Sequence, residues 1–143
     1  MTKPLKIAPY NVIEKSAWLY IDNRRVLFAR SRGQTLAYTI GGKIEPGEMV
    51  EEALVREVTE ETGVRLLPGS IEFYFLFVGP CDGYVEGTKL KMYAYTARYE
   101  GAIAPQAEIE ELIYLTSADI GKGRTTTVGE QILDHLAYQG RID

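Results

Sequence analysis

Glutamates crowd one short stretch of this sequence at spacings that suit chemistry. Glu57, Glu60 and Glu61 lie within five consecutive positions. On a helix each residue advances by about 100°, so Glu61 falls about 40° from Glu57 and Glu60 about 60° to its other side. Carboxylates this close repel one another unless a cation compensates them. Mg²⁺ or Mn²⁺ binds carboxylate oxygens and takes substrate phosphates as further ligands. The pattern therefore favours metal-assisted hydrolysis of a phosphate compound.

The helix that must carry these glutamates is predicted over residues 49–62. Acidic residues in its first turn suit the helix dipole, and Gly63 is placed to cap its C-terminus. Leu54, Val55 and Val58 form a neighbouring apolar face that can anchor the helix to a sheet. The glutamates are thus expected on the side that faces away from the core.

Apolar runs bounded by turn residues predict the strands that hold this helix. Strands are expected at residues 17–21, 26–29, 36–40, 71–78, 90–98 and 112–115, with a second helix at 127–138. Residues 17–21 and 26–29 are expected to pair as a hairpin, and residues 1–12 to be a lead-in or an edge strand. This order predicts an α/β protein with a mixed sheet between helices, in a single domain spanning residues 1–143.

Composition narrows the classes of function. The net charge is −4 and no basic stripe is present, which argues against a nucleic-acid binder. A single cysteine allows no internal disulfide. The N-terminus has no apolar core of signal-peptide type, and no apolar run reaches the length of a membrane helix. We therefore expect a cytoplasmic protein that acts on a small molecule and not at a membrane.

Seven identities around the glutamates form one larger pattern. Gly42 is followed after five residues by Glu48 and, after seven more, by the segment from Arg56 to Val64, which reads REVTEETGV. At average residue usage this combination is expected by chance about once in 10⁸ positions. The pattern matches, without gap or mismatch, the signature of the Nudix hydrolases, and the chain resembles a single domain of that family.

The resemblance implies an α/β/α sandwich that hydrolyses nucleoside diphosphates linked to another group, with Mg²⁺ or Mn²⁺. It gives catalytic and metal-binding roles to one set of positions, namely the side chains of Glu57, Glu60 and Glu61 and the backbone carbonyl of Gly41 or Gly42. Glu48 and Arg56 match the residues that hold the loop against the helix. The family often has proline before the glycine pair, where this chain has Ile40.

Substrate choice rests on residues outside the signature. Tyr38 could stack on a base or pack in the core, and Arg30 and Arg32 could reach a phosphate; Lys43, directly after the glycines, completes the candidate substrate-binding set. A compact chain with a tyrosine beside the glycines most resembles the MutT-type enzymes, which convert a (d)NTP into NMP and diphosphate. Pro80 keeps ADP-ribose or a nucleotide sugar as the alternative, and a nucleotide-sensing domain without catalysis is a further one. Homodimers are common among relatives, so a homodimer is possible.

A separate carboxylate is expected to activate water, because glutamates bound to metal make poor bases. Many relatives supply this group from the loop before the late strand. Here that loop holds Glu108, Glu110 and Glu111. Glu108 is the first candidate and Glu111 the second; if residues 110–112 are extended, Glu111 points to the face opposite Glu110.

Overall fold

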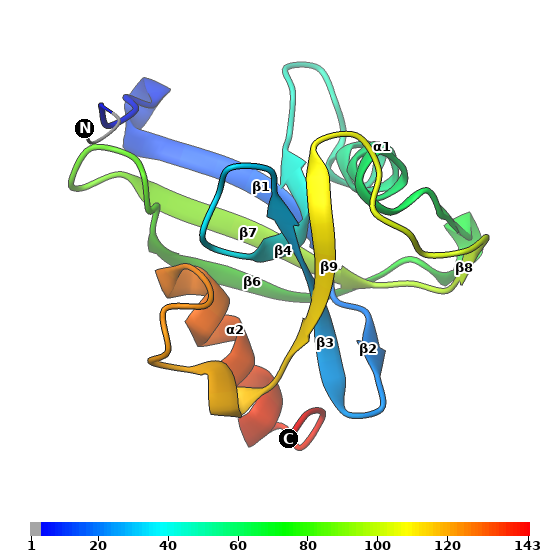
Figure 1. Cartoon of the computed structure of the whole chain (residues 1–143). Coiled ribbons are helices and arrows are strands. Elements are labelled where there is room, and N and C mark those ends of the chain that lie inside the picture. Colours follow the sequence, from blue (N-terminus) through cyan, green and yellow to red (C-terminus); the bar gives the residue numbers. More distant parts are fainter. Residues whose placement is uncertain (1–3) are drawn as a thin grey trace.

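A computed structural model describes residues 4–143, and Figure 1 shows its helices and strands. The strands are β1 (Val12–Trp18), β2 (Ile21–Asp22), β3 (Arg25–Ser31), β4 (Tyr38–Lys43), β5 (Arg65–Leu66), β6 (Glu72–Pro80), β7 (Lys89–Thr96), β8 (Tyr99–Glu100) and β9 (Ile109–Leu115). The α-helices are α1 (Val50–Thr62) and α2 (Thr127–Tyr138), and short 3₁₀ helices span Pro9–Asn11, Pro68–Ser70 and Ser117–Asp119.

One seven-stranded sheet organises the molecule. Its order is β2-β3-β4-β1-β7-β6, and β9 pairs with β3. β1 and β7 run parallel, whereas the other neighbouring pairs are antiparallel. In Figure 1, β3 and β9 cross the direction of β1, β7 and β6, and β4 lies where the two groups meet. β5 and β8 form a separate two-stranded ribbon. The mixed sheet predicted from the sequence is confirmed.

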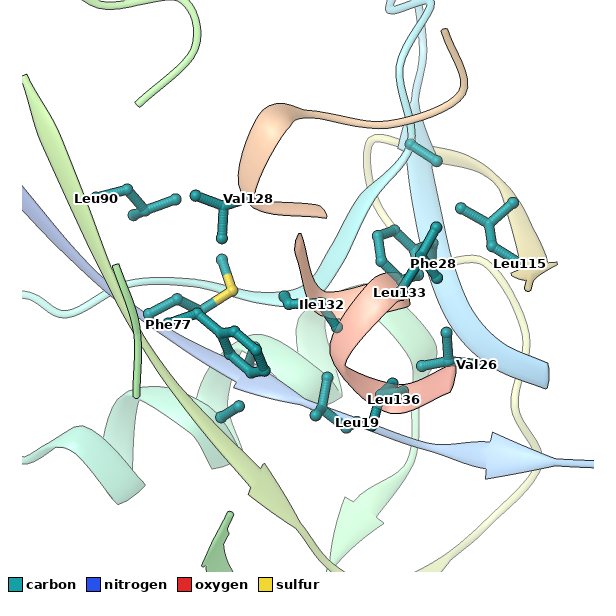
Figure 2. Packing of buried hydrophobic residues seen from close by; sticks show 14 of the residues in the cluster. Leu19, Val26, Phe28, Phe77, Leu90, Leu115, Val128, Ile132, Leu133 and Leu136 are labelled. Atoms are coloured by element: carbon teal, nitrogen blue, oxygen red, sulfur yellow. The ribbon is translucent and has the colours of Figure 1, made fainter. Parts of the chain in front are cut away.

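The two α-helices cover opposite faces of this sheet. Leu27 and Ala29 of β3 pack in the same apolar cluster as Leu54 of α1. Val26 and Phe28, the alternate residues, pack in a second cluster with α2, and Figure 2 shows them beside that helix. Because successive side chains of a strand point to opposite faces, α1 and α2 lie on opposite sides. The fold is the expected α/β/α sandwich.

The boundaries of α1 follow from local contacts. At its N-terminus the Met49 N–H donates to the Glu52 carboxylate at 2.8 Å. At its C-terminus Gly63 adopts a left-handed conformation with φ 80°, and its N–H donates to the Thr59 carbonyl at 2.9 Å. The helix therefore occupies nearly the whole predicted range. No helix in the part of the chain described here is long and apolar enough to cross a membrane.

The hairpin expected between residues 17–21 and 26–29 forms only next to its turn. β1 ends at Trp18, and its partners are β4 and β7. Next to the turn, the short β2 pairs with β3, and the Leu27 N–H donates to the Tyr20 carbonyl at 2.9 Å. Trp18 is fully buried and its indole Nε1 donates to the Ala97 carbonyl at 3.1 Å, which fixes the end of β1 beside the chain that follows β7. This long-range anchor overrides the local hairpin pattern.

β4 also continues beyond its expected end at the glycine pair. It runs through Gly41 and Gly42 to Lys43, and these residues pair with Lys15–Ala17 of β1. A Cβ atom on Gly41 would lie 2.0 Å from the Ser16 carbonyl oxygen, so only glycine permits this approach of the two strands. The glycines are thus part of the sheet and present their backbone to α1. Of the lead-in segment, residues 1–3 lie outside the described part, and β1 begins at Val12.

Candidate active site

The predicted glutamate stripe of α1 faces β4. Leu54 and Val58 are fully buried and fasten the helix to the sheet, which leaves the next stripe of the helix beside the glycine pair. The Gly41 N–H donates to Glu61 Oε1 at 2.8 Å. A Cβ atom on Gly42 would lie 2.5 Å from Glu57 Cδ. Two of the three predicted glutamates therefore rest directly on the backbone of Gly41 and Gly42.

Glu61 has the most perturbed carboxyl group of the site. Burial raises its pKa from the ordinary 4.5 to about 8, and the Gly41 N–H opposes this rise. The charges of Glu57, Glu108 and Glu60 raise the pKa further. A buried carboxylate among like charges is costly unless a cation joins it. A cation bound beside Glu61 would therefore stabilise the ionised form of this carboxyl group.

Glu57 and Glu60 differ in exposure. Burial raises the pKa of Glu57, and the hydrogen bond from Arg56 Nη1 at 2.8 Å opposes that effect. Glu60 Oε1 lies 3.6 Å from the same Arg56 Nη1, and its side chain is 54% exposed. Glu60 therefore stands at the open side of the stripe, whereas Glu57 and Glu61 lie on the sheet side.

Arg56 and Glu48 join the loop 43–48 to α1, as expected of them. Arg56 Nε donates to Glu48 Oε2 at 2.8 Å and Arg56 Nη2 to Glu48 Oε1 at 2.9 Å. Arg56 Nη2 also donates to the Lys43 carbonyl at 3.2 Å, and Glu48 Oε1 accepts the Glu45 N–H at 3.0 Å. The Arg56 guanidinium holds the pKa of Glu48 at about 2. The pair thus fixes the loop and places Arg56 beside Glu57.

Glu108 reaches the same region from the loop before β9. It lines one cavity with Glu61, and its charge raises the pKa of both Glu57 and Glu61. Arg32 holds this loop: its N–H donates to the Glu108 carbonyl at 2.9 Å and its Nη1 to the Ala107 carbonyl at 2.8 Å. Arg32, a predicted substrate-binding residue, therefore contacts the loop that presents Glu108.

The structure does not bring Arg30 or Glu111 to this cavity. Arg30 Nε donates to Glu111 Oε1 at 2.9 Å, and Arg30 Nη1 donates to Glu110 Oε2 at 3.1 Å. Arg30 and Glu111 are opposite each other in the register of β3 and β9, on the same face as the pair Phe28–Ile113, which packs toward α2. A register shift next to Arg30 lets Glu110 turn to the same guanidinium. These residues satisfy one another on the face away from α1.

A cavity of about 360 Å³ lies beside the glutamates and combines both signs of charge. Its lining includes Gly41, Gly42, Glu61 and Glu108 together with Tyr38, Lys6, Lys15 and Lys43. Tyr38 is half-exposed and lies under the Lys15 ammonium, whose Nζ is 5.5 Å from the ring centroid. Tyr38 and Lys43 were predicted from the sequence. Lys6 and Lys15 were not, and the only sequence signal was a lysine within an otherwise half-buried strand.

The donor set fits a hard divalent cation. Glu57 and Glu61 offer carboxylate oxygens against the glycine backbone, and burial raises the pKa of Glu61 well above its ordinary value. Within residues 4–143, no three acidic, histidine or cysteine side chains converge as a ready-made metal cage. Mg²⁺ is commonly bound by one or two carboxylates, with substrate phosphates and water as its remaining ligands.

With this geometry in view, comparison with known proteins identifies the class. The sequence model of the NUDIX domain matches residues 14–136, so the chain belongs to the Nudix family and is a Nudix hydrolase. Members of this family generally use divalent metal ions. The family predicted from the signature is confirmed.

Individual relatives agree with this assignment. The chain is 34% identical over 99 residues to the NAD-capped RNA hydrolase NudC of Deinococcus radiodurans, covering 67% of this chain and 32% of that protein. It thus spans about a third of the length of this curated relative. A Nudix hydrolase family member from Chromobacterium violaceum superposes with a TM-score of 0.69 at 27% identity, covering 92% of this chain and 80% of that one. The MutT protein of Bacillus halodurans shares the fold, with a TM-score of 0.67 at 20% identity and coverage of 91% and 85%.

Proposed function

We propose that this chain hydrolyses the diphosphate linkage of a nucleoside diphosphate derivative, first of all a (d)NTP, giving NMP and diphosphate with Mg²⁺ or Mn²⁺. The observation that carries the proposal is the cavity that joins the acidic stripe of α1 to cationic side chains. Glu61 and Glu108 line it together with Lys15 and Lys43. A site with carboxylates for a metal and ammonium groups for phosphates suits an anhydride substrate.

Metal binding is assigned to Glu57, Glu61 and the carbonyl of Gly41 or Gly42, with Glu60 at the open side. A divalent ion bound there supplies charge neutralisation for the phosphates and lowers the pKa of coordinated water. The rigid part of this site is the glycine backbone, because it pairs with β1 on one side and contacts both glutamates on the other. Arg56 offsets part of the acidic charge through Glu57.

We assign Glu108 as the group that takes the proton. In the proposed step, a water oxygen bonds to phosphorus, the bridging P–O bond breaks, and diphosphate departs with the bond electrons. Glu108 accepts one proton of that water. Its position in the cavity and its influence on the pKa of Glu61 support this role. Glu111 is the weaker candidate, because it binds Arg30 on the other face of the sheet.

A diphosphate-linked dinucleotide is the second candidate substrate, favoured by the 34% identity to the NAD-capped RNA hydrolase. ADP-ribose and nucleotide sugars share that linkage, and Pro80, which resembles the ADP-ribose-cleaving subgroup, ends β6 at the rim of a small pocket with Tyr38. A nucleotide-sensing role without catalysis is less supported, since every glutamate of the signature is present.

The test is a substrate panel with purified protein. Canonical and oxidised (d)NTPs, ADP-ribose, a nucleotide sugar and NAD are incubated with Mg²⁺ or Mn²⁺, and NMP, phosphate and diphosphate are quantified. We expect the highest kcat/KM for a (d)NTP, with equal amounts of NMP and diphosphate. A kcat/KM for ADP-ribose or NAD well above that for every (d)NTP would reverse the order of candidates. The homodimer and the cytoplasmic location stay predictions, the first of them testable by light scattering on a sizing column.

A further inference from the structure

Three lysines from separate parts of the chain meet at the cavity. Lys15 belongs to β1 and Lys43 to β4, and the two are directly opposite each other in the antiparallel register. Lys6 comes from the lead-in segment, where it bridges to Tyr84 in the loop between β6 and β7. All three line the same cavity. They are referred to below as the lysine cluster.

Each ammonium group of the lysine cluster lies over an aromatic ring. Lys6 Nζ lies 5.7 Å and Lys43 Nζ 5.3 Å from the centroid of the Tyr84 ring, and Lys15 Nζ lies 5.5 Å from that of Tyr38. Such contacts attract a cation to the ring face without neutralising its charge. Among the ion pairs formed by the residues the structure describes, none includes a lysine of this cluster. No carboxylate therefore offsets the charge of these lysines through an ion pair within the described residues.

Without a bound anion, the close approach of these lysines destabilises the folded protein. Like charges directly opposite in a sheet destabilise it. Burial lowers the pKa of Lys15, and the charges of Lys43 and Lys6 lower it further, while Cys81 and Tyr84 act in the opposite direction. A polyanion in the cavity removes both penalties at once, because it neutralises the ammonium groups and gives them hydrogen-bond acceptors.

Position selects the part of the substrate that binds here. Lys43 directly follows Gly42, so the lysine cluster begins beside the backbone that contacts Glu57 and Glu61. A nucleotide whose scissile phosphate sits at these glutamates extends its neighbouring phosphates along the cavity. A terminal phosphate adds roughly 1.5 to 2 negative charges at neutral pH. A diphosphate that links two nucleosides or sugars has no such group.

We propose that Lys6, Lys15 and Lys43 form the subsite for the terminal phosphates of a nucleoside triphosphate, and so make the enzyme select triphosphates over diphosphate-linked dinucleotides. This inference rests on the proposed function. After cleavage the same subsite holds the diphosphate product. Lys15 and Lys6 are thus specificity-determining residues outside the family signature.

The experiment uses Lys15→Met and Lys6→Met, with Lys122→Met, an exposed lysine remote from the cavity, as the matched control. Binding of inorganic diphosphate is measured by calorimetry with Mg²⁺ present, and KM and kcat are measured for the best dNTP and for NAD. We expect Lys15→Met to weaken diphosphate binding and raise KM for the dNTP by at least tenfold. KM for NAD rises less than KM for the dNTP, Lys122→Met keeps the wild-type constants for both substrates, and Lys15→Arg restores the dNTP values.

The outcomes separate the subsite from the proposed function. Hydrolysis of dNTPs with unchanged KM and diphosphate affinity in both Met variants would overturn the subsite and leave the function in place. If diphosphate binding depends on the lysines but the protein hydrolyses no dNTP, the proposed function is overturned and the subsite stays in place. An equal loss for dNTP and NAD would also overturn the subsite's selectivity. If Lys15→Met fails to fold, Lys6→Met decides alone, because Lys6 is exposed and lies outside the sheet.

Discussion

Replacing Glu61 by glutamine separates two effects of this carboxylate: the loss of stability that it causes in the metal-free protein, and its contribution to metal binding and catalysis. Glutamine keeps an oxygen for the Gly41 N–H, which donates to Glu61 at 2.8 Å, and removes the charge. Burial raises the pKa of Glu61 from 4.5 to about 8. Because the folded protein then holds a proton more tightly than the unfolded chain, the stability of the metal-free wild type falls as pH rises from 4.5 to 8.

The size of this effect follows from the same values. A tenfold change in an ionisation constant is worth about 1.4 kcal/mol, so ionising Glu61 costs roughly 3 kcal/mol at pH 7 and about 5 kcal/mol above pH 8. Chemical denaturation of metal-free protein at several pH values measures it. Glu61→Gln should match the wild type near pH 4.5 and become increasingly more stable than it toward pH 8. Glu51→Gln, an exposed position on the same helix, serves as the control with no such trend.

With metal and substrate present, the wild type should be favoured over Glu61→Gln. Mg²⁺ at 100 times its Kd should stabilise the wild type by about 2.7 kcal/mol and Glu61→Gln much less. We expect kcat of Glu61→Gln to fall by at least ~10²-fold, about 2.7 kcal/mol of transition-state stabilisation. If stability of the metal-free variant and wild type shows the same pH dependence, the electrostatic argument fails. If Glu61→Gln and Glu60→Gln both keep wild-type turnover, the site assignment is wrong.

Four further variants probe the other residues of the site. Arg56→Ala should weaken Mg²⁺ binding and lower the melting temperature. Because Arg56 lowers the pKa of Glu48, the wild type should lose stability as pH falls from 4.5 toward 2, and the variant should lack this loss. Unchanged stability with lost activity would make Arg56 a phosphate contact instead. Glu108→Gln should lower kcat about 10²-fold and flatten the acidic limb of the pH profile, with unchanged metal affinity. Glu111→Gln should keep the wild-type kcat, and near-normal rates in both variants would mean that neither residue is the base. Gly42→Ala places a carbon 2.5 Å from a carboxyl carbon of α1, so kcat should fall at least ~10-fold, and a fully active variant would show that this contact is dispensable.

The parts of the fold that the sequence predicted best are those determined by neighbouring residues. The glutamate spacing, the first-turn acids and Gly63 all act within α1, and the helix runs over Val50–Thr62 against the expected 49–62. The same holds for the link between Glu48 and Arg56, which are eight positions apart. Local chemistry was sufficient there because each signal and its partner lie within a few turns of chain.

Features that depend on distant segments were missed or misplaced. The pairing of Arg30 with Glu111 spans 81 positions, so nothing near either residue shows that they neutralise each other. The lysine cluster requires the register of β1 with β4 and a bridge from Lys6 to Tyr84. The early hairpin was overestimated because the buried end of β1 at Trp18 is fixed by a contact 79 positions away.

The most direct test of the central claim follows the reaction of a dNTP by phosphorus NMR. Metal-free enzyme is mixed with the dNTP, and Mg²⁺ or Mn²⁺ is then added in water enriched in ¹⁸O. The account predicts no reaction before the metal is added, and then equal formation of NMP and diphosphate with one ¹⁸O in a single product. Turnover that persists in a chelator, or release of orthophosphate in place of diphosphate, would contradict it.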